Sequence, residues 1–183
     1  MSTLFVNNLN TASGSTIQVA SGKTIHQTGS VLQVVTKTFG DQTSVTSSGT
    51  TYTDVTNVTI TITPKFNNSQ ILIIPNITLL IQDSSSNYMY FGVRCLRGSS
   101  TVLSPGLNTD GNGSYDYGIG VAPASGTMNT LQFDTRVTAH HIDTPATTSA
   151  TTYKFQAINY SAGRTTTVNH TGGSTILAME IAQ

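Results

Sequence analysis

The segment Gln70–Gln82 (QILIIPNITLLIQ) constrains the fold of this chain more than any other. Successive side chains of a strand point to opposite faces. A strand that is apolar on both faces must be covered on both. In an antiparallel sandwich, the second cover is often another subunit, so the segment predicts both a sandwich and self-association. Before Pro75, Ile71 and Ile73 lie on one face of the strand, and Leu72 and Ile74 lie on the other. After Pro75, one face carries Ile77, Leu79 and Ile81, and the reverse face carries Leu80.

A buried helix is the competing interpretation of this segment. The β-branched residues and Pro75 argue against it, since branched side chains favour strands and a proline interrupts a helix. Within a strand, Pro75 predicts a bulge or an edge position.

Other segments alternate apolar and polar residues, as half-buried strands do. In Val58–Thr63 (VTITIT), valine and isoleucine alternate with threonine until Pro64 ends the pattern. After a turn at Gly40–Gln42, Thr43–Ser48 is expected to pair back on the preceding strand as a hairpin, and Thr165–His170 is expected to return from a hairpin turn at Ser161–Arg164. Further strands are predicted at Val31–Phe39, Tyr52–Val55, Tyr88–Leu96, Thr101–Leu103, Thr130–Ile142, Thr151–Tyr160 and Ser174–Ala182, with Pro105–Gly126 irregular.

These strands, with turns between them and no amphipathic helix, predict an all-β antiparallel sandwich or jelly roll. An N-terminal segment stands apart from it. Ala12–Gln27 reads ASGSTIQV ASGKTIHQ, an eight-residue unit written twice. Such units become stable by stacking along the chain or against copies of the chain; a flexible Ser/Gly linker is the alternative. We interpret residues 1–30 as a short fibrous β-repeat neck that trimerises, and residues 31–183 as the head domain. Ahead of the repeat, Leu4, Phe5 and Val6 are candidates for docking onto another protein.

The charge content limits the classes of partner. Only 9% of residues are charged, and the formal net charge is zero. Without a basic stripe a nucleic-acid partner is not expected, and no apolar run approaches the roughly 20 residues of a membrane span. Any ligand must be held by short-range hydrogen bonds and ring stacking, which suits neutral glycans or another protein surface.

Motifs for metals and small ligands were considered at two places. His140 and His141 are adjacent on an expected strand, so their side chains point to opposite faces and do not easily share one ion; one histidine per chain on a three-fold axis is the alternative. The run Asn108–Gly113 resembles the start of a calcium loop, but Ile119 stands where a bidentate Glu is needed. A small recognition surface for sugars is the remaining hypothesis for this loop, against an ordinary loop, and its candidates are Asn108, Asp110, Asn112, Tyr115, Asp116 and Tyr117.

Enzymatic chemistry is not expected. No phosphate-binding glycine loop or nucleophile elbow is present, and the few acidic residues do not suggest a glycosidase pair. No cofactor or resident metal is predicted. Glu180 lies opposite Met179 in its strand, and a structural ion pair with Lys154 or Arg94 is expected. Cys95 is the only cysteine, so no disulfide forms within the chain.

Four stretches resemble small fibre and appendage proteins of tailed bacteriophages, especially those of marine bacteria and cyanobacteria. They are VNNLNTASGSTIQVASGKTI, GSVLQVV, TYTDVTNVTITITPKFNNSQILI and the C-terminal TYKFQAINY with STILAMEIA. The resemblance implies a homotrimer, an N-terminal virion-attachment segment that contacts other virion proteins, and a jelly-roll head of the C1q/tumour-necrosis-factor class. The expected function is that of a virion structural component, a short fibre or decoration protein. A receptor-binding tip that recognises a host surface glycan is the alternative.

Overall fold

The computed structural model describes residues 27–45, 51–83, 89–103, 118–121, 131–159, 165–170 and 173–183. This part of the chain is all strand and loop, and it contains no helix that is long and apolar enough to cross a bilayer. The strands are β1 (Val31–Phe39), β2 (Thr43–Val45), β3 (Thr53–Ile62), β4 (Gln70–Asp83), β5 (Met89–Arg97), β6 (Thr101–Val102), β7 (Gly118–Val121), β8 (Leu131–Thr138), β9 (His141–Asp143), β10 (Thr151–Asn159), β11 (Thr165–Val168) and β12 (Ser174–Ile181).

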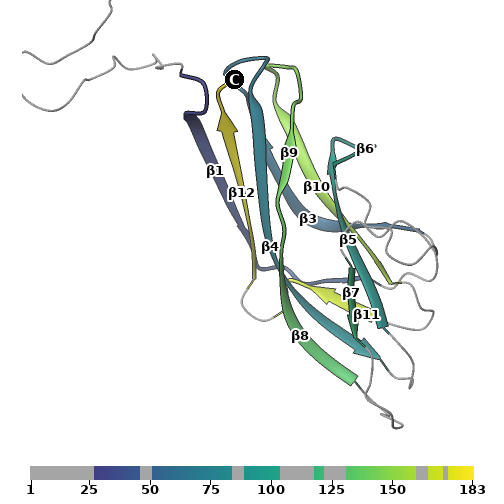
Figure 1. The fold of residues 1–183 in the computed structure, drawn as a ribbon. Coiled ribbons are helices and arrows are strands. Elements are labelled where there is room, and N and C mark those ends of the chain that lie inside the picture. Colours follow the sequence, from purple (N-terminus) through teal and green to yellow (C-terminus); the bar gives the residue numbers. More distant parts are fainter. Residues whose placement is uncertain are drawn as a thin grey trace, which may run out of the picture.

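The strands form two antiparallel sheets that face each other (Figure 1). The first sheet has the order β1-β12-β4-β11-β2, and β8 and β9 also pair with β4. The second sheet has the order β3-β10-β5-β6, and β7 also pairs with β5. The predicted all-β antiparallel sandwich is therefore confirmed.

Pairing in the sandwich is nested along the chain. The first strand pairs with the last (β1 with β12), then β3 with β10, β4 with β8 and β9, and β5 with β6 and β7. A long antiparallel ribbon wound over itself in this way is the double-sheet arrangement of a jelly roll. This order follows from the pairing alone and agrees with the jelly-roll head expected from the sequence.

The core lies between the two sheets, where the inward residues of both meet. Tyr153 and Phe155 of β10 and Phe91 of β5 are its largest members, each at most 1% exposed. Val58, Ile60 and Ile62 of β3 are also buried, as their alternation with threonine predicted. Full burial of one such side chain contributes roughly 1.5–3 kcal/mol. The apolar residues of the alternating strands therefore favour the face that packs against the opposite sheet.

β4 is the central strand of the first sheet and is apolar on both faces. Ile71 and Ile73 are fully buried in the core, whereas Leu72 and Ile74 lie half-buried on the outer face. Pro75 does not mark a bulge or an edge, as the sequence analysis had expected. Pro75 pairs in register with Ile176 of β12 on one side of β4. On the other side, β9 pairs with β4 up to Ile73 and β8 pairs from Asn76 onward, so Pro75 lies where the neighbouring strand is interrupted. The missing N–H of Pro75 is tolerated because the neighbouring strand is interrupted there.

Four other expectations about the strands were wrong, two of them about pairing. β2 pairs with β11 and not with β1, and β11 pairs with β4 and β2 and not with β10. The segment expected as one strand at Thr130–Ile142 is divided into β8 and β9, and β7 lies within the stretch expected to be irregular. Alternation tells which face of a strand is buried, but it does not tell which sheet the next strand joins.

The neck predicted at residues 1–30, the repeat at Ala12–Gln27 and the docking residues Leu4, Phe5 and Val6 lie almost entirely outside the described residues, which begin at position 27. The same holds for the candidate recognition residues Asn108, Asp110, Asn112, Tyr115, Asp116 and Tyr117.

Candidate functional site

An apolar surface crosses the outside of the first sheet at the end where β1 begins. Four strands place one apolar residue each in a single row: Val34 of β1, Met179 of β12, Leu72 of β4 and Ile142 of β9. Val34 is 50% exposed and Ile142 is 59% exposed, although both are large and hydrophobic. The strands stand side by side in Figure 1. An exposed contiguous apolar patch of this kind is typical of an interaction surface.

The next row extends the same surface. It runs from Thr36 through Leu177 to Ile74. Because β9 and β8 pair with β4 in one continuous register, Ile73 with His141 and Asn76 with Thr138, the row continues from Ile74 to His140, just outside β9. We call the apolar members of both rows the outer apolar face: Val34, Leu72, Ile74, Ile142, Leu177 and Met179. Only His140, at the margin, is ionisable among the eight residues of the two rows. The sequence predicts that both faces of β4 are apolar, but the alignment of β4 with β1, β12 and β9 depends on register, which no local pattern contains.

Two buried carboxylates lie on the core side of the same sheet. Glu180 pairs in register with Gln33 on one side and Ile71 on the other, and Ile71 in turn pairs with Asp143. Glu180 is 0% exposed and Asp143 is 7% exposed. Since buried charges are costly unless their oxygens are hydrogen-bonded, the partners of both groups decide whether they are structural or reactive.

Glu180 is held by uncharged donors from the turn between β3 and β4 and from β1. Its Oε1 accepts hydrogen bonds from the Lys65 N–H (2.7 Å), the Phe66 N–H (3.3 Å) and the Ser69 hydroxyl (2.7 Å). Its Oε2 accepts one from Gln33 Nε2 at 2.6 Å. Burial acts to raise the pKa of Glu180, but the hydrogen bonds from Ser69, Gln33 and the two backbone groups outweigh it and hold the pKa below its usual value.

The ion pair expected between Glu180 and Lys154 or Arg94 is wrong. Lys154 Nζ contacts Asp54 at 2.9 Å, and Arg94 Nε donates to Gln156 Oε1 at 2.7 Å. Asp54 of β3 and Gln156 of β10 both belong to the second sheet, whereas Glu180 points into the core from the first sheet. Glu180 therefore anchors a turn and takes no part in an ion pair with either residue.

Asp143 joins the two sheets. Its Oδ1 lies 2.8 Å from Arg97 Nη1 of β5, and its Oδ2 accepts a hydrogen bond of 2.8 Å from the Tyr153 hydroxyl of β10. Burial, together with the hydrogen bond to Asp143, raises the pKa of Tyr153. The carboxylate is thus engaged on both oxygens by the opposite sheet, and the cluster is a cross-sheet clamp.

The two adjacent histidines point to opposite faces, as their spacing predicted. His141 is 3% exposed and faces the core, while His140 is exposed. Burial, with a smaller contribution from His140, lowers the pKa of His141 to about 4. Among the described residues, no group of three His, Cys, Asp or Glu side chains is placed to hold a metal ion.

Cys95 is buried in the core, and burial raises the pKa of its thiol. Because the thiolate is the reactive form, we expect the native protein to react with Ellman's reagent about a hundredfold or more slowly than the urea-unfolded chain. Equal rates would show that β5 opens readily. The measurement follows absorbance after mixing, with and without urea.

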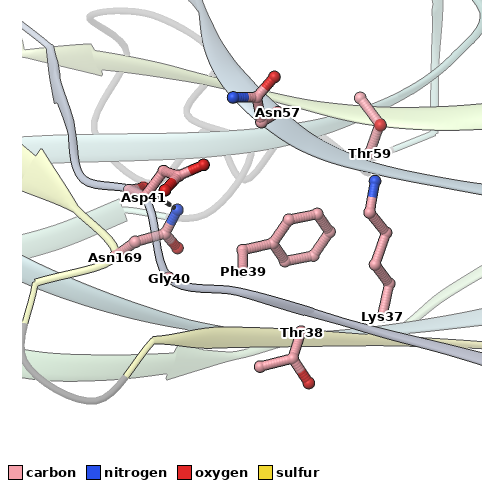
Figure 2. A pocket seen from close by; sticks show the side chains of 8 residues that line it. All are labelled: Lys37, Thr38, Phe39, Gly40, Asp41, Asn57, Thr59 and Asn169. Carbon is pink, nitrogen blue, oxygen red and sulfur yellow. Dashed lines mark hydrogen bonds between the residues drawn. The ribbon is translucent and has the colours of Figure 1, made fainter.

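A polar pocket of about 310 Å³ opens elsewhere, at the free edge between β1 and β3 (Figure 2). It was not anticipated, because its residues come from three separate parts of the chain. They are Lys37, Thr38, Phe39, Gly40, Asp41, Asn57, Thr59 and Asn169.

No protein-family model and no curated protein sequence matches the chain. Among solved structures, it is similar to chains of infectious bursal disease virus. The match to the Gx strain structure has 14% identity and a TM-score of 0.32, and it covers 91% of this chain and 42% of that one. The match to the VP2 subviral particle has 16% identity, a TM-score of 0.29 and coverages of 92% and 42%. The chain thus spans about two fifths of the chains it matches.

Proposed function

We propose that this chain is a structural, non-enzymatic component of a tailed-bacteriophage virion, namely a short fibre or decoration protein that assembles as a homotrimer. The observation that supports assembly into a homotrimer is the outer apolar face, on which Val34 and Ile142 are exposed in the single chain and the other four members are half-buried. The four sequence stretches that resemble phage appendage proteins supply the virion context. Segment 1–30 would attach the trimer to other virion proteins.

A second copy of the chain suits the outer apolar face better than a charged partner does. In a homotrimer the same residues of the three copies approach one another near the three-fold axis, so a surface that lies close to this axis must avoid like charges. The two rows of the face carry side chains that are neutral apart from the marginal His140. Val34 and Ile142 are 50% and 59% exposed, so covering each would contribute about half of the roughly 1.5–3 kcal/mol that the full burial of such a side chain provides.

The entry point of the chain agrees with attachment by the N-terminus. Residues 27–30 lead into β1 beside the end of β12, where Gly29 N–H donates to Ala182 O at 2.8 Å and Ala182 N–H donates to Ser30 O at 2.9 Å. These bonds fix residues 29 and 30 to the last strand. The N-terminal segment therefore joins the head beside the end of β12, and a trimeric head would bring three such junctions to one end.

The test is the oligomeric state of the full chain by size-exclusion chromatography with light scattering. We expect a mass three times that of one chain. The double variant Val34→Asp/Ile142→Asp is expected to be a folded monomer, because both positions are exposed in the single chain but a buried charge in an interface costs several kcal/mol.

The control is Thr61→Asp, which puts one such negative charge on an exposed position of β3 in the other sheet. It is expected to remain trimeric. A monomeric wild-type protein would contradict the proposal, and a double variant that remains trimeric would place the contact elsewhere.

A further inference from the structure

The polar pocket between β1 and β3 is formed where the two sheets separate at an open edge. In Figure 2, the Phe39 ring lies between Asp41 and Asn169 on one side and Lys37 on the other, and β3 crosses opposite it. The Lys37 ammonium lies 5.0 Å from the centre of the Phe39 ring. Phe39 is 6% exposed, so it forms the floor where the pocket meets the core.

A bulge in β3 forms the opposite wall of the pocket. Lys154 of β10 pairs with Thr59, but Gln156 pairs with Asp54, so the β3 residues between these two lie opposite Phe155 alone. Asn57 lies in this bulge with φ of 66°, in the left-handed region. Bulges bend the strand and redirect side chains, and they are frequent beside functional sites.

Asn169 closes the pocket from the end of β11. It also has a left-handed backbone, with φ of 62°, and is 2% exposed. Its Nδ2 donates to the Asp41 carbonyl at 2.8 Å and its N–H donates to the Thr78 carbonyl at 2.8 Å, while its Oδ1 has no hydrogen-bond partner among the described residues. Two of the three described non-glycine residues with positive φ thus line one pocket, and such conformations cluster at functional sites.

The lining favours a neutral ligand that is rich in hydroxyl groups. One ammonium (Lys37) and one carboxylate (Asp41) lie on opposite sides of the floor, so neither an anion nor a cation gains a net attraction. The remaining polar groups, including the Asn57 amide and the Thr59 hydroxyl, are neutral donors and acceptors. Thr38 points away from the pocket in Figure 2. The volume lies near the lower limit of small-molecule sites, about 300 Å³.

We propose that the pocket of Lys37, Phe39, Asp41, Asn57, Thr59 and Asn169 binds a neutral carbohydrate through one sugar ring. The ring hydroxyls would exchange hydrogen bonds with Asp41, Asn57 and Thr59, and Lys37 would cover one side. The site is separate from the outer apolar face, because Lys37 and Phe39 project from the opposite side of β1 to Val34. The proposal therefore stands whether or not the chain is trimeric.

The test is saturation-transfer NMR of the full chain with the methyl glycosides of glucose, galactose, mannose and N-acetylglucosamine, and with glucuronate. We expect transfer to at least one neutral sugar, with a dissociation constant on the order of 1 mM. Two variants remove pocket groups: Asp41→Ala removes an exposed carboxylate, and Asn57→Gly removes the amide but keeps a residue that accepts positive φ. Each is expected to weaken binding at least about tenfold, equivalent to 1.4 kcal/mol.

Ala146→Gly is the matched control. Ala146 is the third non-glycine residue with positive φ, at 53°, and it lies in the loop before β10, outside the pocket. This variant is expected to bind like the wild type. The proposal would be overturned if no neutral sugar showed transfer or if glucuronate alone bound. It would also be overturned if both pocket variants bound sugar as tightly as the wild type does. A thermal melt of each variant confirms that it is folded.

Discussion

Replacing Glu180 with Ala is expected to lower the free energy of unfolding by at least about 3 kcal/mol. The substitution removes the acceptor of four hydrogen bonds, a buried one from Ser69 and three partly buried ones from Gln33, Lys65 and Phe66. Each unsatisfied buried donor costs about 1–3 kcal/mol, although some will reach water when the turn moves. In a chain of this length the expected loss lowers the melting temperature by about 6–12 °C. Thermal unfolding is followed by circular dichroism at one protein concentration.

The matched control for this variant is Asp134→Ala. Asp134 is half exposed and contacts His170 at 2.9 Å, and an exposed pair of this kind is worth about 0–1 kcal/mol. Its melting temperature should therefore stay close to that of the wild type. Equal melting temperatures for the Glu180 and Asp134 variants would mean that the turn finds other acceptors and that the carboxylate does not anchor it.

The acid limb of the stability curve gives an independent check on Glu180. Hydrogen bonds to the ionised form hold its pKa in the folded protein below the usual value of about 4.5. The unfolded chain therefore binds the proton at higher pH than the folded chain does, and protonation favours unfolding. The stabilisation is complete above the unfolded pKa and is lost as pH falls through the folded pKa. Between pH 5 and 3, the melting temperature of the wild type should accordingly fall more steeply than that of Glu180→Ala.

The sequence predicted the strands well because burial in a sandwich follows a two-residue period. Val58, Ile60 and Ile62 showed it against threonine, and β4 showed it on both faces. The partners of the strands were harder to predict. β10 and β11 are consecutive but belong to different sheets. The short sequence between them has the composition of a hairpin turn, so the sequence alone does not show that the chain changes sheets there.

The candidate sites were harder to predict because their residues meet only through register and topology. The outer apolar face depends on the alignment of Val34 with Met179 and onward to Leu72, which no local pattern contains. The pocket had one visible signal. Asn57 separates two stretches that were each expected to be strands, and in the structure this separation is a bulge within one strand, β3. Glu180 was paired with cations by charge alone, whereas a buried carboxylate also accepts backbone N–H groups.

Gly173→Ala is expected to destabilise the fold by about 3 kcal/mol or more. Gly173 has φ of 70°, where an L side chain is strained by about 1–2 kcal/mol. A Cβ at this position would also lie 2.5 Å from the Phe39 carbonyl oxygen. This obstacle is backbone, held by the pairing of β1 with β12, so it cannot rotate away as a side chain would. The overlap must be relieved by moving the end of β1, which overpacks the site by typically 1–3 kcal/mol.

Gly98→Ala separates the two contributions to this effect. Gly98 has φ of 62°, but a Cβ there would meet nothing within 4 Å, so only the backbone strain applies. Urea denaturation should therefore rank the stabilities as wild type, then Gly98→Ala, then Gly173→Ala. Because Phe39 forms the floor of the pocket and Gly40 and Asp41 follow it, a shifted β1 end should also weaken sugar binding in Gly173→Ala and leave it intact in Gly98→Ala. Equal destabilisation by the two variants would mean that β1 and β12 separate at this end without cost, and that the close approach of Gly173 to Phe39 does not hold the pocket floor in place.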